Sequence, residues 1–183
     1  GLNWDNANNI VPEWAQLKQL ISDHPCLFDG AKLTRLSAPD SPIYALLSES
    51  ADGKDSVLVL VNTDAEKENA VGLSKSAIGN QQSAIDLLGQ PLPKISGAQD
   101  KINFTLPPGA ACCLAPNIKP VGLSGDDYRR ARAQAAFAFE ALNKIIPVET
   151  VDGHDWRWLA AQVEHSPQNF LAAASEFAAR ESK

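Results

Sequence analysis

The segment SVLVLVNTDAEKENAVGL, residues 56–73, carries the strongest fold signal of the chain. Its apolar run, 57–61, stops at the polar residues 62–64, and a second apolar patch follows at 70–73. A run that is apolar at every position is typical of a strand buried on both faces, so we expect it at the centre of a sheet or under another layer. Asn and Asp side chains bond their own backbone in turns, so residues 62–64 are expected to reverse the chain.

Length and charge limit the possible functions. The chain has 183 residues, enough for one domain with an appendage or for two small domains. Its 16 basic and 22 acidic residues give a net charge of −6, which argues against a nucleic-acid partner because phosphates attract a cationic surface. No apolar run approaches the ~20 residues that span a bilayer, and no signal-peptide pattern is visible, so no membrane partner is expected.

The three cysteines, Cys26, Cys112 and Cys113, are too few for a disulfide framework. Reduced, buried thiols in a cytoplasmic protein are the plain interpretation. The chain contains no methionine, even at its first position, so a processed chain or a piece of a longer protein is expected. The oligomeric state stays open.

Residues 1–30 are expected to form one amphipathic helix and a linker. Pro12 fits the first helical turn, where its missing N–H loses no bond. His24 is expected to end the helix, because Pro25 disfavours the α conformation in the residue before it. Apolar residues recur in this segment three or four positions apart: Ile10, Trp14, Leu17 and Ile21.

Residues 31–118 are expected to form an antiparallel β-structure. Short apolar segments alternate with turn-forming residues at near-regular spacing, a pattern typical of sandwiches and barrels. Asp52-Gly53 is a tight-turn pair that should join its flanking strands as a hairpin. The segment 101–106 alternates apolar and polar residues, so one of its faces should be buried. The expected strands are 32–37, 43–48, 57–62, 68–73, 83–87, 101–106 and 111–115.

Residues 119–183 are expected to be a helical extension. Ser124 and the acidic residues Asp126 and Asp127 fit the start of its first helix, and Pro147 fits the end. We expect its apolar stripe to lie against the sandwich or, as the alternative, to form a docking surface for another protein. The stripe consists of Tyr128, Ala131, Ala135, Phe139, Leu142 and Ile146.

Two further helices are expected, one at 155–164 and one beginning at Ser166-Pro167, a good N-cap and first position. The predicted fold class is therefore α+β: an antiparallel β-sandwich of Greek-key type with about 6–8 strands, an N-terminal helix and about three C-terminal helices. The inward-facing residues of the last two helices are expected to be Trp156, Leu159 and Val163, and Phe170, Ala174 and Phe177.

The order of the segments DSVLVLVNTD, AVGL, AIDLLGQPLP and INFTLPPGAACCLAP resembles the C-terminal β-sandwich of the α-amylase superfamily, glycoside hydrolase family thirteen. Those domains have a hydrophobic strand ending in Asn, here Asn62, then a D-L-L-G segment, and a closing L-x-P-G-x-x-x-x-L strand, here 106–114. The segment 3–30 resembles the helix by which such enzymes leave their catalytic barrel, although Asp23 or His24 stands where the family often has Arg.

The resemblance implies support rather than catalysis. The family's reaction depends on an Asp, a Glu and a second Asp on barrel strands, with a retaining pair only ~5 Å apart. These residues lie upstream of the exit helix, and no matching motif occurs here, so no catalytic residue and no cofactor is implied. The chain alone is expected to be inactive, and its implied partners are the catalytic barrel of the parent chain and an α-glucan.

Other chemistry-bearing patterns are incomplete. The sequence has no G-x-x-x-x-G-K phosphate loop and no G-x-S-x-G nucleophile motif. We interpret His24, His154 and His165 as surface or helix-end histidines. His24-Pro25-Cys26 resembles part of a metal site, but no second ligand pair stands at zinc-binding spacing, so no metal is expected.

Trp156 and Trp158 are the candidate sugar contacts, because exposed indole rings stack on sugars. Helix residues two positions apart point in different directions, so one is expected in the core and the other covering it. Trp4 and Trp14 are expected on the face that meets the barrel.

Three functions fit these observations. The favoured one is a non-catalytic accessory domain of an α-glucan-acting glycosidase or glycosyltransferase, which stabilises the catalytic barrel. The alternatives are a protein-docking or oligomerisation module that uses the C-terminal helices, and a free-standing carbohydrate-binding module.

Overall fold

The computed structural model divides the chain into two compact units, Gly1–Ser124 and Gly125–Lys183. The residues that it describes are 9–28, 30–79, 81, 85–98, 100–144, 156–166, 168–170, 172, 175–176 and 179. Among these residues, no helix combines the length and the apolar character needed to cross a bilayer.

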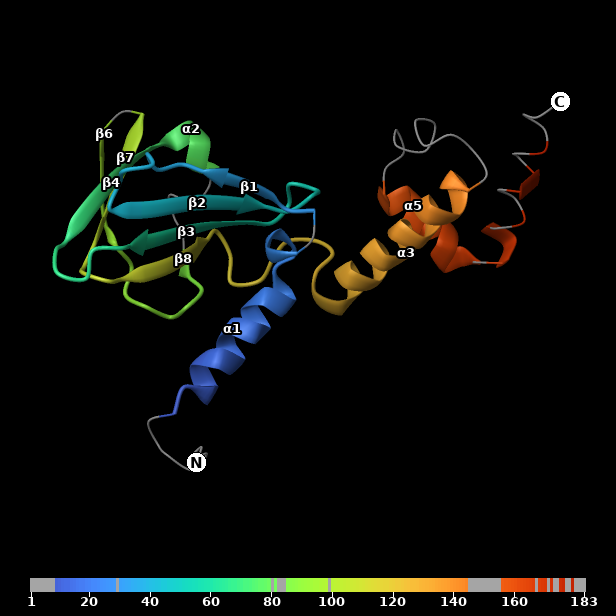
Figure 1. Cartoon of the computed structure of the whole chain (residues 1–183), viewed down its shortest axis with the longest axis horizontal. Helices are drawn as coiled ribbons and strands as arrows, with labels where there is room; N and C mark the ends of the chain where they lie inside the picture. The colour runs from blue at the N-terminus through green and yellow to red at the C-terminus, as the bar shows by residue number, and fades with distance from the viewer. Residues whose placement is uncertain are drawn as a thin grey trace. The chain divides into compact units, whose positions relative to one another are not determined.

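The first unit is built from two antiparallel sheets (Figure 1). The five-stranded sheet has the order β1-β2-β3-β8-β5, and the three-stranded sheet has the order β4-β7-β6. The predicted α+β class with antiparallel sheets is confirmed. The strands are β1 (Lys32–Arg35), β2 (Ile43–Glu49), β3 (Ser56–Asn62), β4 (Asn69–Ser74), β5 (Ile85–Asp86), β6 (Lys94–Ala98), β7 (Lys101–Leu106) and β8 (Ala111–Ala115).

The apolar run 57–61 lies in β3, the central strand of the larger sheet, as predicted. β3 pairs along its full length with β2, which forms the hairpin predicted around Asp52-Gly53, and with β8 on its other side. Gly53 has a φ of +66°, in the left-handed region that a tight turn requires and glycine enters without strain.

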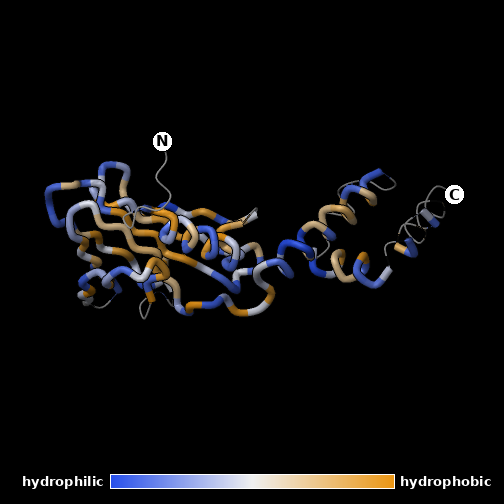
Figure 2. Tube along the Cα trace, turned by 90° about the horizontal axis from the view of Figure 1, so that it is seen from below, coloured by the Kyte–Doolittle hydropathy of each residue, from blue (hydrophilic) through white to orange (hydrophobic). Residues whose placement is uncertain are grey.

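Side chains of β3 alternate between two apolar clusters. Leu58 and Leu60 are buried in the core that the two sheets share, together with Phe104 of β7. Val57 and Val59 face a smaller cluster that residues of the N-terminal helix and the turn after it help to form. Figure 2 shows hydrophobic residues concentrated along the strands of this unit. Since each fully buried aliphatic side chain contributes about 1.5–3 kcal/mol, β3 anchors both clusters.

Some elements differ from the sequence-based expectation. β6 was not expected, because the side chains of residues 94–97 are exposed and show no apolar alternation; it forms by pairing with β7 at the sheet edge. The single helical turn α2 (Lys75–Ile78) was not expected either. β1 ends two residues earlier than predicted, and the first half of the predicted strand 83–87 lies outside the described residues.

The predicted N-terminal helix is present as α1 (Val11–Asp23), and the 3-10 turn η1 (Pro25–Leu27) follows it. One side of α1 contacts the sandwich: the Gln16 amide nitrogen donates to the Leu87 carbonyl oxygen at 3.3 Å, and Leu20 packs on the smaller cluster. No residue of α1 is buried, and the predicted apolar stripe is exposed. In Figure 1 the N-terminal part of α1 extends away from the sheets.

The second unit contains α3 (Gly125–Asn143) and α5 (Trp156–His165), which confirm two of the predicted helices. The apolar stripe of α3 packs against α5, a partner that neither expected arrangement had named, because both helices are amphipathic and cover each other's apolar face. The shared cluster contains Ala131, Ala135, Ala138, Leu142, Trp156, Leu159, Ala160, Val163 and Phe170.

The third predicted helix is described only in part. The Phe170 backbone N–H donates to the Ser166 carbonyl oxygen at 2.9 Å, which agrees with a helix starting there. The predicted features that lie outside the described residues are those at Trp4, Ile146, Pro147, His154, Asp155, Pro167, Ala174 and Phe177.

Candidate functional site

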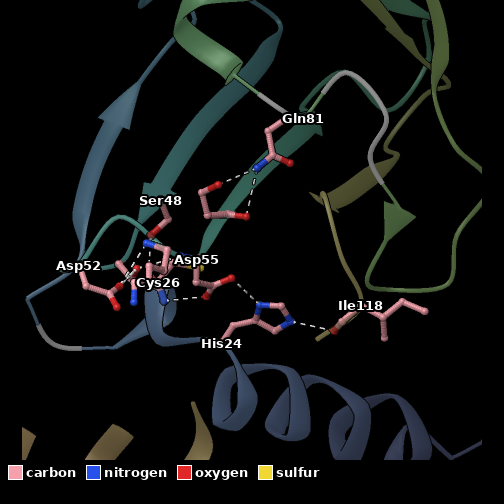
Figure 3. Close-up of polar contacts among 10 residues, drawn as sticks. His24, Cys26, Ser48, Asp52, Asp55, Gln81 and Ile118 are labelled. Carbon is pink, nitrogen blue, oxygen red and sulfur yellow. Dashed lines mark hydrogen bonds and ion pairs between the residues drawn. The ribbon is translucent and has the colours of Figure 1, made fainter. Parts of the chain in front are cut away.

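A buried polar cluster lies where α1 ends (Figure 3). His24, the residue after α1, is only 2% exposed. Its Nδ1 lies 3.1 Å from Oδ1 of Asp55, and its Nε2 lies 3.3 Å from the carbonyl oxygen of Ile118. The helix-end position predicted for His24 is confirmed, whereas the surface position is wrong, because these distant partners cover the ring. His165, at the end of α5, is exposed as predicted.

Asp55 is positioned by the hairpin turn between β2 and β3. Its backbone N–H donates to the Ser50 hydroxyl at 3.0 Å, and its carbonyl oxygen accepts from the Ser50 N–H at 2.8 Å. The Ser50 hydroxyl donates in turn to Asp52 Oδ1 at 2.5 Å. Ser and Asp side chains fasten turns in this way. The hairpin therefore holds the carboxylate that meets the end of α1.

Cys26 belongs to the same cluster. Its backbone N–H donates to Asp55 Oδ2 at 3.0 Å, and its carbonyl oxygen accepts a short hydrogen bond from the Ser48 hydroxyl. A His24 ring nitrogen, the Cys26 sulfur and an Asp55 carboxylate oxygen all lie within 4.8 Å of one another. Figure 3 shows these side chains converging from η1, the hairpin turn and the end of α1.

The surroundings of the cluster set its charge. Burial acts to raise the pKa of Asp55, but hydrogen bonds from His24 and from Cys26 outweigh it and hold that pKa below its ordinary value. Burial, followed by the charge of Asp55, raises the pKa of the Cys26 thiol far above its ordinary value. Only a thiolate is a strong nucleophile, so Cys26 is not activated for covalent catalysis.

A second polar centre involves two of the sequence motifs, the Asn at the end of β3 and the L-P-P-G turn that follows β7. The side-chain nitrogen of Asn62, at the end of β3, donates to the carbonyl oxygens of Lys67, Leu106 and Pro107 at 2.8, 3.2 and 2.9 Å. Its side-chain oxygen accepts from the Asp64 N–H at 3.1 Å, so the expected turn is confirmed. The Asn62 side chain therefore connects the end of β3 to the L-P-P-G turn between β7 and β8 by hydrogen bonds.

The D-L-L-G segment has a similar structural role. Asp86 Oδ1 accepts from the Cys113 N–H and Oδ2 from the Gln90 N–H, both at 2.7 Å. Gly89, with a φ of +70°, lies in the turn between Asp86 and Gln90. The carboxylate is thus occupied by two backbone donors: the Cys113 N–H joins β5 to β8, and the Gln90 N–H holds the turn that follows β5.

The two candidate sugar contacts differ in their surroundings. Trp156 is half-buried and makes a T-shaped contact with Tyr128, with ring centroids 5.7 Å apart. The guanidinium carbons of Arg132 and Arg157 lie 5.0 and 5.3 Å from the Trp156 ring centroid. Trp158 is 50% exposed. The structure therefore places one indole within the unit and leaves the other more accessible, so Trp158 is the stronger candidate for stacking on a sugar.

The sequence did not connect Asp55 with His24, because 31 residues separate them. The available signal was a carboxylate directly before an apolar strand and next to a tight turn, where an unpaired acid would be costly to bury. That pattern marks Asp55 as a residue in need of a partner, but it does not identify the partner.

A scan against known protein families finds no match, and no curated protein matches the chain. Among solved structures, the crystal structure of a glutamate-to-glutamine variant of AmyP in complex with maltotriose is similar, with a TM-score of 0.45 and 26% sequence identity. The similarity covers 57% of this chain and 20% of that chain, and it is a distant structural similarity to AmyP.

Proposed function

We propose that this chain is a non-catalytic accessory part of an α-glucan-acting glycosidase or glycosyltransferase, in which α1 and the sandwich support a catalytic barrel. The motif order that resembles the α-amylase superfamily supports the glucan-acting parent. The exposed apolar side of α1 supports the contact with a barrel, and this observation carries the proposal.

α1 holds its more apolar side away from its own sandwich. Gln16 and Leu20 face the sheets, whereas Trp14 is 63% and Ile21 50% exposed. Contiguous apolar surface of this kind marks an interaction site, since monomeric proteins rarely expose it. The exposed large hydrophobic residues in and next to the helix are Ile10, Val11, Trp14, Leu17 and Ile21.

The buried cluster at the end of α1 holds the helix, and with it the exposed apolar side, in a fixed position on the sandwich. His24 and Cys26 tie the last turn of the helix to Asp55 of the hairpin by hydrogen bonds that are shielded from water. A rigidly held apolar helix binds a partner with less loss of conformational entropy than a free helix does.

The C-terminal helices offer less support for the docking alternative. The α3 stripe that would have formed a docking face is covered by α5 within the second unit. Its central residues Ala135 and Ala138 are buried there. The accessory function therefore gives a role to the apolar side of α1, the most exposed apolar side among the described helices. Docking through the α3 stripe would leave that side without a role.

The variant Ile21→Ser tests the barrel contact. In the isolated chain the half-exposed Ile21 should contribute little, so the free energy of unfolding should change by less than about 0.5 kcal/mol. In a parent polypeptide that contains the barrel, loss of the buried side chain should lower stability by about 1.5–3 kcal/mol. Melting temperature and soluble yield, measured for both proteins, give the comparison.

The matched control is Ile95→Ser, which removes an isoleucine of 44% exposure from β6. It should have the same small effect in the isolated chain and in the parent. Equal effects of Ile21→Ser in both proteins would contradict the barrel contact. Turnover of maltodextrins by the purified chain would contradict the non-catalytic part of the proposal.

The α-glucan contact is assigned to Trp158 within the same proposal. Calorimetry should detect maltodextrin binding to the chain, and Trp158→Ala should weaken it about two- to tenfold, the usual range for one aromatic contact. Phe137→Ala on α3, which removes another exposed aromatic ring, is the control and should leave binding unchanged. Absence of heat at millimolar maltodextrin would remove this contact from the proposal.

A further inference from the structure

His24, Cys26 and Asp55 bring three ligating groups of different chemistry to one buried point. Imidazole nitrogen, thiolate sulfur and carboxylate oxygen are the ligand atoms that zinc takes in proteins. We propose that this cluster binds a zinc ion, with His24 Nδ1, Cys26 Sγ and an Asp55 carboxylate oxygen as ligands. Binding displaces the proton of the Cys26 thiol to solvent, so the sulfur ligates as a thiolate. The inference goes beyond the accessory function and does not depend on it.

The spacing of the ligand atoms fits this ion. Atoms about 2.0–2.1 Å from zinc at tetrahedral angles stand about 3.3 Å apart, and such an atom stands about 3.6 Å from a sulfur ligand. His24 Nδ1 and Asp55 Oδ1 are already 3.1 Å apart. The Cys26 sulfur lies within 4.8 Å of a His24 ring nitrogen and of an Asp55 carboxylate oxygen, at most roughly 1.2 Å farther than zinc ligation requires. Side-chain rotation can supply such a shift.

The hydrogen bonds around the cluster match an outer shell of a zinc site. A zinc-bound histidine usually donates its other ring N–H to a carbonyl or carboxylate, and a ligating carboxylate is itself hydrogen-bonded. His24 Nε2 lies 3.3 Å from the Ile118 carbonyl oxygen, and Asp55 Oδ2 accepts from the Cys26 N–H. These bonds leave Nδ1 and Oδ1 turned toward each other.

Donor counting gives a second reason for a cation. Both ring nitrogens of His24 contact oxygen acceptors, but a neutral imidazole has only one N–H. One of the two contacts therefore lacks a hydrogen: with Nδ1–H donating to Asp55 it is the 3.3 Å contact with Ile118, and with Nε2–H donating to Ile118 it is the contact between Nδ1 and Asp55 Oδ1. A zinc ion shared by both atoms removes this conflict. A second proton on the ring is the competing arrangement, and it gives a buried ion pair without metal.

A cleft lies next to the cluster on the His24 side. A cavity of about 270 Å³ lies between the second half of α1 and the β5 region, and His24 forms part of its wall. Three protein ligands leave one tetrahedral position, which a water molecule from this cleft completes.

Cobalt(II) is the spectroscopic probe for the test, because it occupies zinc sites and reports thiolate ligation by a charge-transfer band. The untagged chain, stripped with a chelator and kept reduced, should bind one equivalent of cobalt with a tetrahedral spectrum that zinc abolishes. Cys26→Ser should lose the charge-transfer band. Cys112→Ser removes a buried thiol from the core between the sheets and, as the matched control, should keep the band.

A measurement on the unmodified chain protects the test against variants that misfold. Zinc alone, at a hundredfold excess over its dissociation constant, should raise the melting temperature by about 5–10 °C, and a chelator should reverse the shift. No cobalt band and no zinc-dependent shift in the unmodified chain would overturn the proposal. An unchanged band in a Cys26→Ser variant with native circular dichroism would also overturn it.

Discussion

Replacing Asn62 with aspartate is expected to lower the free energy of unfolding of the first unit by at least about 3 kcal/mol. The Asn62 amide nitrogen donates to the carbonyl oxygens of Lys67, Leu106 and Pro107. Aspartate has nearly the same shape but no amide N–H, so three carbonyl groups lose a donor and face a carboxylate instead. The turn after β3 and the turn between β7 and β8 would lose their common anchor.

Urea denaturation followed by far-UV circular dichroism measures this loss. Asn103→Asp is the matched control, because it makes the same chemical change at an exposed position of β7. It should alter stability by no more than about 0.5 kcal/mol. A loss below about 1 kcal/mol for Asn62→Asp would show that the Asn62 centre does not hold the two turns together.

Above pH 9 the folded chain is expected to lose about 1.4 kcal/mol of stability per pH unit for each of two buried thiols. Burial, and then the charge of Asp86, raises the pKa of Cys112 from 9.0 to about 11. Burial, then Asp86, Cys112 and Asp55 raise the pKa of Cys113 to about 12. The unfolded thiols ionise first, so stability that is complete below pH 9 falls as the pH rises toward these two values.

A comparison with the double variant Cys112→Ala, Cys113→Ala isolates the two thiols from lysines and tyrosines that titrate in the same range. Between pH 9 and about 10.5 the unmodified chain should lose about 3 kcal/mol more than the variant does, because the unfolded thiols are only half ionised at pH 9. Urea denaturation in the presence of a reductant, repeated across this range, measures the difference. Parallel pH profiles for the two proteins would mean that burial does not hold these thiols protonated.

Local patterns predicted those strands of the sandwich in which the order of apolar and polar residues matches the burial of their side chains. The run 57–61 is apolar throughout and lies at the sheet centre, and 101–106 alternates and buries Ile102, Phe104 and Leu106. The Asp52-Gly53 turn predicted the β2–β3 hairpin. Each of these signals lies within a few residues of the structure that it specifies, which is why no tertiary information was needed.

Other elements depend on partners far away in the chain. β6 has exposed side chains and becomes a strand only because β7 offers it an open edge. The α3 stripe indicated that an apolar partner exists, but its period does not say which element supplies that partner, and the structure shows α5. Amphipathicity determines which face of a helix is buried and leaves the choice of neighbour to tertiary packing.

For the candidate site, the sequence by itself determined that His24 ends a helix, that Cys26 follows within two residues, and that Asp55 stands between a tight turn and an apolar strand. These are consequences of proline, glycine and apolar patterning, which act over a few residues. Only the tertiary structure decided that the three side chains meet and that the apolar side of α1 faces outward. Contacts across 31 residues depend on how the hairpin and the helix end pack together, and packing free energy belongs to the whole folded unit rather than to any local segment.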